Sequence, residues 1–468
     1  MDRRDFLKLA TAGVVGAGAI GRERGSKVSA ATTSPLLPTD LQYKGLFLLP
    51  NDVGTSKFGW SLGTLTGRRI NGNLHLFITG QQGSAGGDGA GLADNPYEID
   101  YPGFGSDLTS APRANLVRDW GPTYQSKLLT TQNGTTEVRG LVFRDGFLWA
   151  SYGYYYNTTG AWDPSIVAVQ LNDTTGSASA YGPWRTSEHS QKTRGYFVPI
   201  PDAFSAGYAG GRRIAVGAPL TSGAANCNIG TSLMALTAIN PLTTPADRPG
   251  DEHRTLNCKR LVYHDADHPQ ERNSNYKVCG WKVAYDCSQG SSVLNGPPNF
   301  GNGFWLNRAS GTISDKITAS AWVKTLSKEG IVVFGEITDV VPGMVYVGDS
   351  LPHMWYGPNA PCCHGQVAVG ADGTGPRSSS QVPMIFTYSP SDLARAAQGI
   401  VTPWGFAANG SAHLNTLAPT IRSIVGPYTF GGAWFDDVDG LLFVSHVGAD
   451  SLTSLYAPRP IIHVFQVH

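Results

Sequence analysis

One short pattern occurs three times in the sequence and limits the folds that this chain can adopt. In its clearest copy, residues 136–156 (TEVRGLVFRDGFLWASYGYYY), two apolar runs are joined by Arg144-Asp145-Gly146. Asp-Gly supplies the positive φ angles of a tight turn, so this copy predicts two antiparallel strands in a hairpin. The other copies are residues 58–78, with a turn at Asn71-Gly72, and residues 428–446, with a turn at Asp439-Gly440.

The composition favours a fold built from many such hairpins. The chain has 468 residues with 58 Gly, 30 Pro, 10% aromatic and 15% charged residues, which is typical of short strands joined by tight turns. One short helix is expected at residues 391–398, with Ser389 as N-cap and Pro390 at its first position. Further strands are expected at residues 43–49, 166–171, 196–200, 213–217, 232–239, 317–323, 331–337, 344–347, 366–369, 383–388 and 461–467.

These elements predict an all-β fold, because no long helical pattern alternates with the strands. A β-propeller, a parallel β-helix and tandem sandwiches are all built from small β units. We favour the propeller, since a β-helix shows a shorter period and no linker separates tandem domains. Blades of about 40 to 60 residues with long loops fit seven blades. The strands at residues 43–49 and 461–467 are expected to pair and close the ring.

The N-terminus carries a targeting pattern. The twin arginines Arg3-Arg4 precede a short, Gly-rich apolar run that ends in Ser29-Ala30-Ala31. Residues 1–31 thus resemble a twin-arginine export signal, which implies a periplasmic or extracellular protein. We expect a linker at residues 32–42 and a single propeller domain at residues 43–468.

The charge and hydropathy of the chain exclude some classes of partner. The formal net charge is +0 at pH 7, so the chain lacks the basic patch expected of a nucleic-acid-binding protein. No stretch after the signal has the apolar length of a transmembrane helix, so membrane insertion is not expected.

Six cysteines in an exported chain predict disulfide bonds, because the compartment is oxidising. Six cysteines allow fifteen pairings, among which sequence alone does not choose. We prefer Cys279 with Cys287, then Cys227 with Cys258, which leaves the vicinal pair Cys362-Cys363 as a strained ring or as thiols.

At the level of architecture, the repeated unit resembles the secreted seven-bladed propellers found among bacterial polysaccharide lyases and uncharacterised exported proteins. The resemblance spans most of the mature chain and rests on pattern, so it assigns no catalytic residue. In a propeller, polar residues just before the inner strands converge at one mouth of the ring. Glu137 and Arg139 hold that position before the first hairpin.

We expect Arg139 to neutralise a substrate carboxylate while Glu137, His364 or Tyr154 moves a proton. In this case Arg139→Ala abolishes turnover with little change in melting temperature. The alternative is a structural salt bridge between Glu137 and Arg139.

Aromatic and histidine side chains are candidates for sugar binding, because sugar C–H faces pack well on aromatic rings. Clusters of this kind also cover the rim of a sheet. The histidines and cysteines of the loop around residues 353–364 offer imidazole and thiolate ligands but lack a zinc-type spacing. We therefore expect no cofactor, with a structural metal as the alternative. The binding candidates are Tyr152, Tyr155, Tyr156, Trp162, His353, Trp355 and His446.

Two further motifs are set aside. Residues 59–63 match the G-x-S-x-G nucleophile elbow at Ser61, but strand-like sequence flanks them on both sides. Asp436-Asp437-Val438-Asp439-Gly440 is similar to part of a calcium loop but lacks the closing Glu.

Together these features predict an exported, monomeric enzyme that acts on an acidic polysaccharide, as a lyase that cleaves next to a uronic acid. A glycosidase needs two carboxyl groups, and the sequence offers Glu137 no evident partner. The alternative is a non-catalytic propeller that binds a glycan or another protein.

Overall fold

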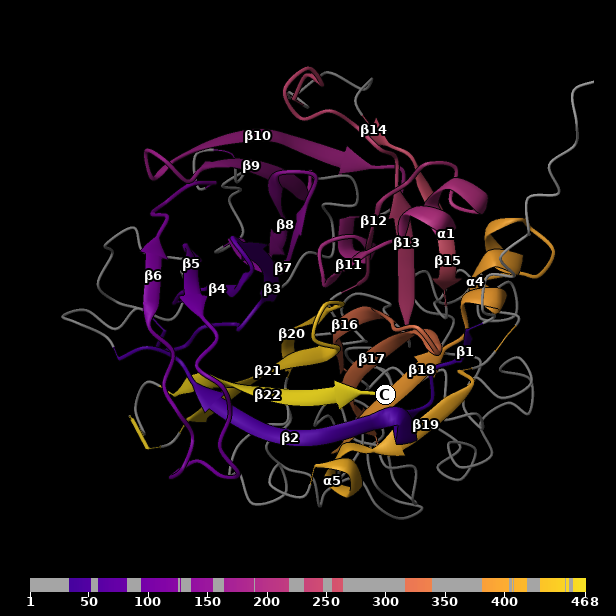
Figure 1. Cartoon of the computed structure of the whole chain (residues 1–468). Helices are drawn as coiled ribbons and strands as arrows, with labels where there is room; N and C mark the ends of the chain where they lie inside the picture. The colour runs from indigo at the N-terminus through magenta and orange to yellow at the C-terminus, as the bar shows by residue number, and fades with distance from the viewer. Residues whose placement is uncertain are drawn as a thin grey trace, which may run out of the picture. The chain divides into compact units, whose positions relative to one another are not determined.

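In the computed structural model, the described strands form five sheets, each built mainly from consecutive antiparallel strands (Figure 1). These strands belong to one compact unit, residues 33–468. The expected export signal and the expected strands at residues 344–347 and 366–369 lie outside the described residues. The structure describes residues 33–51, 58–81, 94–124, 127, 136–154, 164–188, 190–218, 231–246, 255–263, 316–338, 381–403, 406, 408–418, 430–450, 452–453 and 458–468.

Each sheet has four strands in a meander, and two sheets carry one extra short parallel strand. The first sheet contains β3 (Leu65–Ile70), β4 (Asn73–Thr79), β5 (Pro96–Asp100) and β6 (Leu116–Asp119). The second contains β7 (Thr136–Arg144), β8 (Phe147–Tyr154), β9 (Ile166–Asn172) and β10 (Ser177–Thr186), with β14 (Thr255–Leu256) added beside β10. The third contains β11 (Phe197–Pro199), β12 (Ile214–Val216), β13 (Ser232–Leu236) and β15 (Cys258–Tyr263).

The last two sheets include the strands from the N-terminal part of the described chain. The fourth contains β16 (Lys316–Lys324), β17 (Lys328–Thr338), β18 (Gln381–Tyr388) and β19 (Gly410–His413), with β1 (Ser34–Pro35) parallel to β17. The fifth contains β20 (Phe430–Asp436), β21 (Leu441–Asp450), β22 (Arg459–Val467) and finally β2 (Leu41–Leu48).

The first strand of each sheet forms part of an inner ring. Strand β3 contacts β7, β7 contacts β11, β11 contacts β16, β16 contacts β20, and β20 contacts β3 (Figure 1). This closed ring of inner strands identifies the fold as a β-propeller, as the sequence predicts. The described residues form five blades, whereas the length of the chain predicts seven. That estimate divided the whole length after the signal by a typical blade length, and this length includes the stretches 264–315 and 339–380, which lie outside the described residues.

The three repeated hairpins are the two inner strands of three blades, β3–β4, β7–β8 and β20–β21. The two turn residues have the expected positive φ in two of them, 51° and 84° at Asn71-Gly72 and 55° and 80° at Asp145-Gly146. One boundary is wrong: residues 58–60 form a turn, and β3 begins only at Leu65.

The inner strands approach one another so closely that glycine is required where they begin. A Cβ atom at Gly140 in β7 would lie 2.1 Å from the carbonyl oxygen of Gly195, just before β11. A Cβ atom at Gly431 in β20 would lie 2.0 Å from the carbonyl oxygen of Leu62, just before β3. The glycine that opens the apolar run in two of the hairpin copies is therefore explained by contact between blades.

The ring closes where both ends of the propeller meet, as the sequence predicts. Strand β2 pairs antiparallel with β22 and forms the outer strand of the fifth blade. Tyr43 of β2 bonds Nδ1 of His463 over 3.0 Å, and Nε2 of His463 bonds Nδ1 of His446 over 3.2 Å. Both imidazoles are completely buried, and burial with the nearby His446 holds the pKa of His463 well below its usual range.

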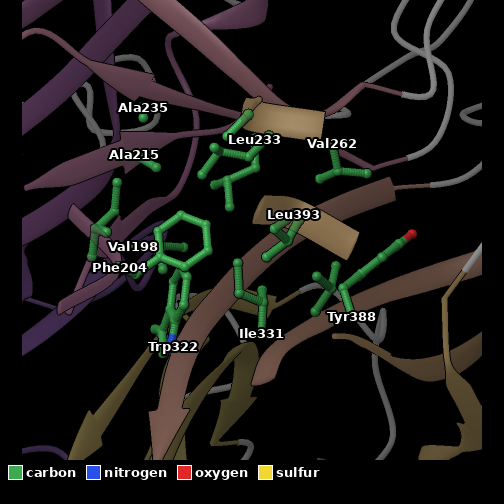
Figure 2. Close-up of a cluster of buried hydrophobic side chains, with 14 of the residues drawn as sticks. Val198, Phe204, Ala215, Leu233, Ala235, Val262, Trp322, Ile331, Tyr388 and Leu393 are labelled. Carbon is green, nitrogen blue, oxygen red and sulfur yellow. The ribbon is translucent and has the colours of Figure 1, made fainter. Parts of the chain in front are cut away.

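Apolar clusters fill the spaces between neighbouring blades. Figure 2 shows the cluster between the third and fourth blades, where the Phe204 and Trp322 rings meet edge to face at 4.7 Å. Helix α4 (Pro390–Ala397) packs Leu393 into this cluster. Its N-cap Ser389 accepts a hydrogen bond from the Ser391 N–H, as predicted. Two further short helices, α1 (Asp202–Gly207) and α5 (Leu414–Leu417), were not expected from the sequence.

Arginine side chains join the first blade to its neighbours. Arg68 donates to both carboxylate oxygens of Glu98, at 3.0 and 2.9 Å, and to both of Asp173 in the second blade, at 2.6 and 3.1 Å. The Arg68 guanidinium also lies 5.0 Å from the centre of the Phe77 ring and 5.1 Å from that of Phe143. The buried charges of Arg68 and Glu98 thus have opposite partners, which offset the cost of their burial.

We predict that Gly140→Ala destabilises the propeller by about 1–3 kcal/mol, because the added methyl group forces two backbones apart. The matched control is Gly207→Ala, at the end of α1, where an added Cβ would have no neighbour within 4 Å. Urea unfolding followed by tryptophan fluorescence measures both variants. Equal stability of the two variants would contradict the required close approach.

We also predict that the propeller loses stability as the pH falls below about 6.5, the usual pKa of histidine. The unfolded state then binds protons that the folded His463 does not, so the free energy of unfolding falls by up to about 1.4 kcal/mol per pH unit. Urea unfolding at pH 7.5 and 5.5 measures the slope. His463→Gln is the control, and its slope should be smaller than that of the wild type.

Candidate functional site

The candidate site lies at the end of the ring where the inner strands begin. Close approaches between the residues that open neighbouring inner strands, such as Gly140 with Gly195, define this end, which we call the mouth. Glu137 and Arg139 lie there, at the start of β7. A register shift between Val138 and Gly140 shows a β-bulge at this point, and bulges often redirect side chains beside functional sites.

The structure brings Glu137 and Arg139 together as an ion pair. Nη2 of Arg139 donates to Oε2 of Glu137. The Glu137 side chain is 3% exposed and that of Arg139 is 13% exposed. The charge of each side chain thus offsets the buried charge of the other, as expected for a structural salt bridge.

Asp94 is a second buried carboxyl group at the mouth, and the sequence analysis missed it. It lies just before β5, and its Oδ2 accepts a hydrogen bond from the Val138 N–H over 3.3 Å. Its own carbonyl accepts a hydrogen bond from the buried Tyr124 hydroxyl. The side chain is 1% exposed, and within the described part of the chain Oδ1 has no hydrogen-bond partner.

The surroundings of Asp94 favour its neutral form. Burial raises the pKa of the Asp94 carboxyl well above its ordinary value, and the nearby Glu137 charge adds to the rise. The Val138 hydrogen bond and the Arg139 charge lower the pKa, and each effect is smaller than that of burial. Because of this rise, Asp94 holds its proton to a higher pH than an exposed aspartate does.

A second arginine, Arg194, packs beside Gly153, which lies opposite Glu137 in the sheet. Gly153 of β8 is the register partner of Glu137, and a Cβ atom at Gly153 would lie 2.4 Å from Cδ of Arg194. The stem of Arg194 therefore occupies the space that a side chain at position 153 would fill. Arg194 is 2% exposed. The mouth thus gathers ionisable groups from three separate segments of the chain.

The other predicted site residues are placed differently or not described. Tyr152 is 1% exposed and packs in the apolar cluster with Val138 and Leu148. His446 is buried in the fifth blade, where it bonds His463. The backbone of Tyr154 ends β8. The predictions that lie outside the described residues concern Tyr155, Tyr156, Trp162, His353, Trp355 and His364.

The two motifs set aside have structural partners. Ser61 is buried, donates to the carbonyl of Thr79 over 2.6 Å and accepts from the Gly63 N–H over 2.9 Å. In the calcium-like segment, Asp436 and Asp439 both accept hydrogen bonds from Arg69. Arg69 thereby joins the first blade to the fifth.

One expected disulfide bond is wrong. Cys258 at the start of β15 is a free thiol, whereas a disulfide bond with Cys227 was expected. Its Sγ atom points to the carbonyl of Leu256 at 3.7 Å, and the side chain packs against the apolar cluster of the second and third blades. Cys227, Cys279, Cys287, Cys362 and Cys363 lie outside the described residues.

Within the described part of the chain, no helix has the length and apolar character needed to cross a membrane.

Comparison with known proteins shows only distant likenesses in fold. No protein-family model and no curated protein matches the sequence. A member of the DUF4221 family from Bacteroides vulgatus is 10% identical, with 91% of this chain and 97% of that chain covered and a TM-score of 0.31. A family AA12 carbohydrate-active enzyme from Trichoderma reesei, in a calcium structure, is 12% identical, with 94% and 98% covered and a TM-score of 0.34.

The haemagglutinin-neuraminidase ectodomain of parainfluenza virus 5 is 8% identical to this chain. The alignment covers 92% of this chain and 87% of the viral one, with a TM-score of 0.29. None of these activities is transferred to this chain.

We predict that Arg139→Ala lowers the free energy of unfolding by about 3–5 kcal/mol, because it leaves Glu137 buried without its partner. This replaces the expectation of an unchanged melting temperature. Glu137→Gln combined with Arg139→Ala should recover part of the loss, since no charge then remains unpaired.

The control is Arg144→Ala, which removes an arginine paired with the exposed Asp202 and should cost at most about 1 kcal/mol. Urea unfolding compares the three variants. A loss for Arg139→Ala as small as that for Arg144→Ala would contradict the buried pair.

Proposed function

We propose that the propeller is an enzyme that acts on an acidic polysaccharide, with acid–base chemistry at the mouth. The observation that carries the proposal is Asp94, a buried carboxyl group that has an oxygen without a partner among the described residues and whose pKa is raised by burial. A carboxyl group of this kind, next to the carboxylate of Glu137, provides an acid and a base in one site. Perturbed titratable groups of this kind are concentrated at functional sites.

The proposed reaction is elimination next to a uronic acid. A base removes the proton from C5 of the uronate, the C4–O bond breaks, a C4–C5 double bond forms, and the leaving oxygen takes a proton. We assign the last step to Asp94, because its neutral carboxyl group can donate a proton. Glu137 is the candidate base, and Arg139 stabilises the charge on the substrate carboxylate.

Arg139 serves this role from within its ion pair. A guanidinium group has five N–H donors and can bind two carboxylates at once, as Arg68 binds Glu98 and Asp173 in this chain. A hydrolase is the alternative reaction, since Asp94 is a second carboxyl group close enough to Glu137 to feel its charge. The products distinguish elimination from hydrolysis.

A specific observation favours the alternative, a non-catalytic propeller that binds a glycan or another protein. The charges of Glu137 and Arg139 compensate each other across the bulge at the start of β7, as in a structural clasp. In either case, we propose an exported, monomeric protein. Its partner is a polysaccharide if it is an enzyme, and a glycan or another protein if it is not.

The test is a panel of acidic polysaccharides, namely polygalacturonate, alginate and hyaluronan. We predict new ultraviolet absorbance from an unsaturated uronate with the wild type and a loss of at least about 100-fold with Asp94→Asn. Because burial favours the neutral form of Asp94 and Asn has nearly the same shape, Asn should replace it with little change in melting temperature. Activity should fall as the pH rises through the raised pKa of Asp94.

The control is Asp202→Asn, since Asp202 is an exposed carboxylate in α1, and it should keep full activity. New reducing ends without ultraviolet absorbance would replace the lyase by a hydrolase. Binding without any product would support the non-catalytic alternative, and full activity of Asp94→Asn would remove Asp94 from the mechanism.

A further inference from the structure

Trp60 has a strained backbone and an exposed side chain at the mouth. Its φ angle is 59°, in the left-handed region, and its side chain is 46% exposed. The other described non-glycine residues with positive φ are Asn71, Asp94 and Asp145, whose short polar side chains tolerate this conformation. A bulky residue in the left-handed region is an outlier, and such strain is concentrated at functional sites.

The turn around Trp60 is fixed from both sides. Phe58 is completely buried, and its ring meets that of Tyr97 edge to face at 5.0 Å. Ser61 is buried and bonds the Thr79 carbonyl. The Trp60 N–H itself donates to the carbonyl of Pro458 over 3.1 Å. These anchors hold the backbone in place and leave the indole partly exposed to solvent.

A short series of contacts connects this turn to the candidate site. Ser61 forms a β-bridge with Gln81. The Gln81 carbonyl accepts from the Asp94 N–H over 2.7 Å, and the Asp94 carboxyl group accepts from the Val138 N–H. Val138 lies between Glu137 and Arg139. Trp60 therefore borders the same mouth as the ionisable groups.

We infer that Trp60 is the stacking platform of a sugar-binding subsite at this mouth. An indole presents a flat apolar face, and the C–H face of a pyranose ring packs on such a surface. The occupant we propose is one pyranose ring of the polysaccharide whose neighbouring uronate contacts Arg139. The ligand class rests on the proposed function, whereas the platform itself rests on the strain, exposure and position of Trp60.

The experiment measures binding of polygalacturonate oligomers by isothermal titration calorimetry. Trp60→Leu should bind about tenfold more weakly than the wild type, because it removes the aromatic face. Trp60→Gly should bind as weakly but melt at a higher temperature than Trp60→Leu, since glycine adopts positive φ without strain. Trp60→Tyr should retain most of the affinity.

The matched control is Tyr208→Leu. Tyr208 is also an exposed aromatic residue, at 41%, but it follows α1 between β11 and β12, at the opposite end of its blade. Its variant should bind as tightly as the wild type. Wild-type affinity in both Trp60→Leu and Trp60→Gly would overturn the inference.

The same measurement separates this inference from the proposed function. Wild-type binding without cleavage, weakened by Trp60→Leu, supports the platform and overturns the enzyme. Cleavage that depends on Asp94 but with binding unchanged in Trp60→Leu supports the enzyme and overturns the platform. Neutral cello-oligosaccharides complete the panel. If the wild type binds only these and Trp60→Leu does not, the platform is supported and the acidic substrate is overturned. A wild type that binds no oligosaccharide overturns both the platform and the proposed function.

Discussion

The close approach of the inner strands is the constraint on which the rest of the propeller depends. Each blade can meet its neighbours at the centre only if the residues that begin its first strand leave room for the next backbone. Gly140 against Gly195, and Gly431 against Leu62, provide this room. The approach also sets the bulges, because β7 and β20 both shift register where their glycines lie. The bulge in β7 in turn places Glu137 and Arg139 at the mouth.

The inner half of each blade was predictable from sequence, and much of the outer half was not. The hairpins and the closing pair β2–β22 follow from apolar runs and turn residues that the chain shows plainly. In contrast, β6 is mostly exposed, and β10 begins with small residues that are exposed or half-buried. Strands at the outer edge of a blade bury less surface, so their apolar alternation is weaker. The strands β6, β10, β15 and β19, which are the fourth strands of their blades, were not predicted. The buried third strand β5 was not predicted either.

The candidate site was predictable only where its residues are neighbours in sequence. Glu137 and Arg139 are two residues apart, and their pairing was one of the alternatives that the sequence left open. Asp94 joins them through a hydrogen bond to Val138 across 44 positions of sequence. Nothing in the local pattern around Asp94 signals this contact, because it depends on how the first blade packs against the second.

The two ends of the first blade differ in how fully their buried polar groups are paired and in backbone strain. Arg68, away from the mouth, donates hydrogen bonds to the carboxylates of Glu98 and Asp173, and its guanidinium lies close to two aromatic rings. At the mouth, Asp94 has an oxygen without a partner among the described residues, and Trp60 retains a strained backbone.

Stability alone disfavours both a buried carboxyl oxygen without a partner at position 94 and a strained backbone at position 60. An orphaned carboxyl oxygen and a strained, exposed indole at the same end of the ring are instead what a ligand site requires. The contrast between the ends is therefore a stronger reason to place function at the mouth than either residue is by itself.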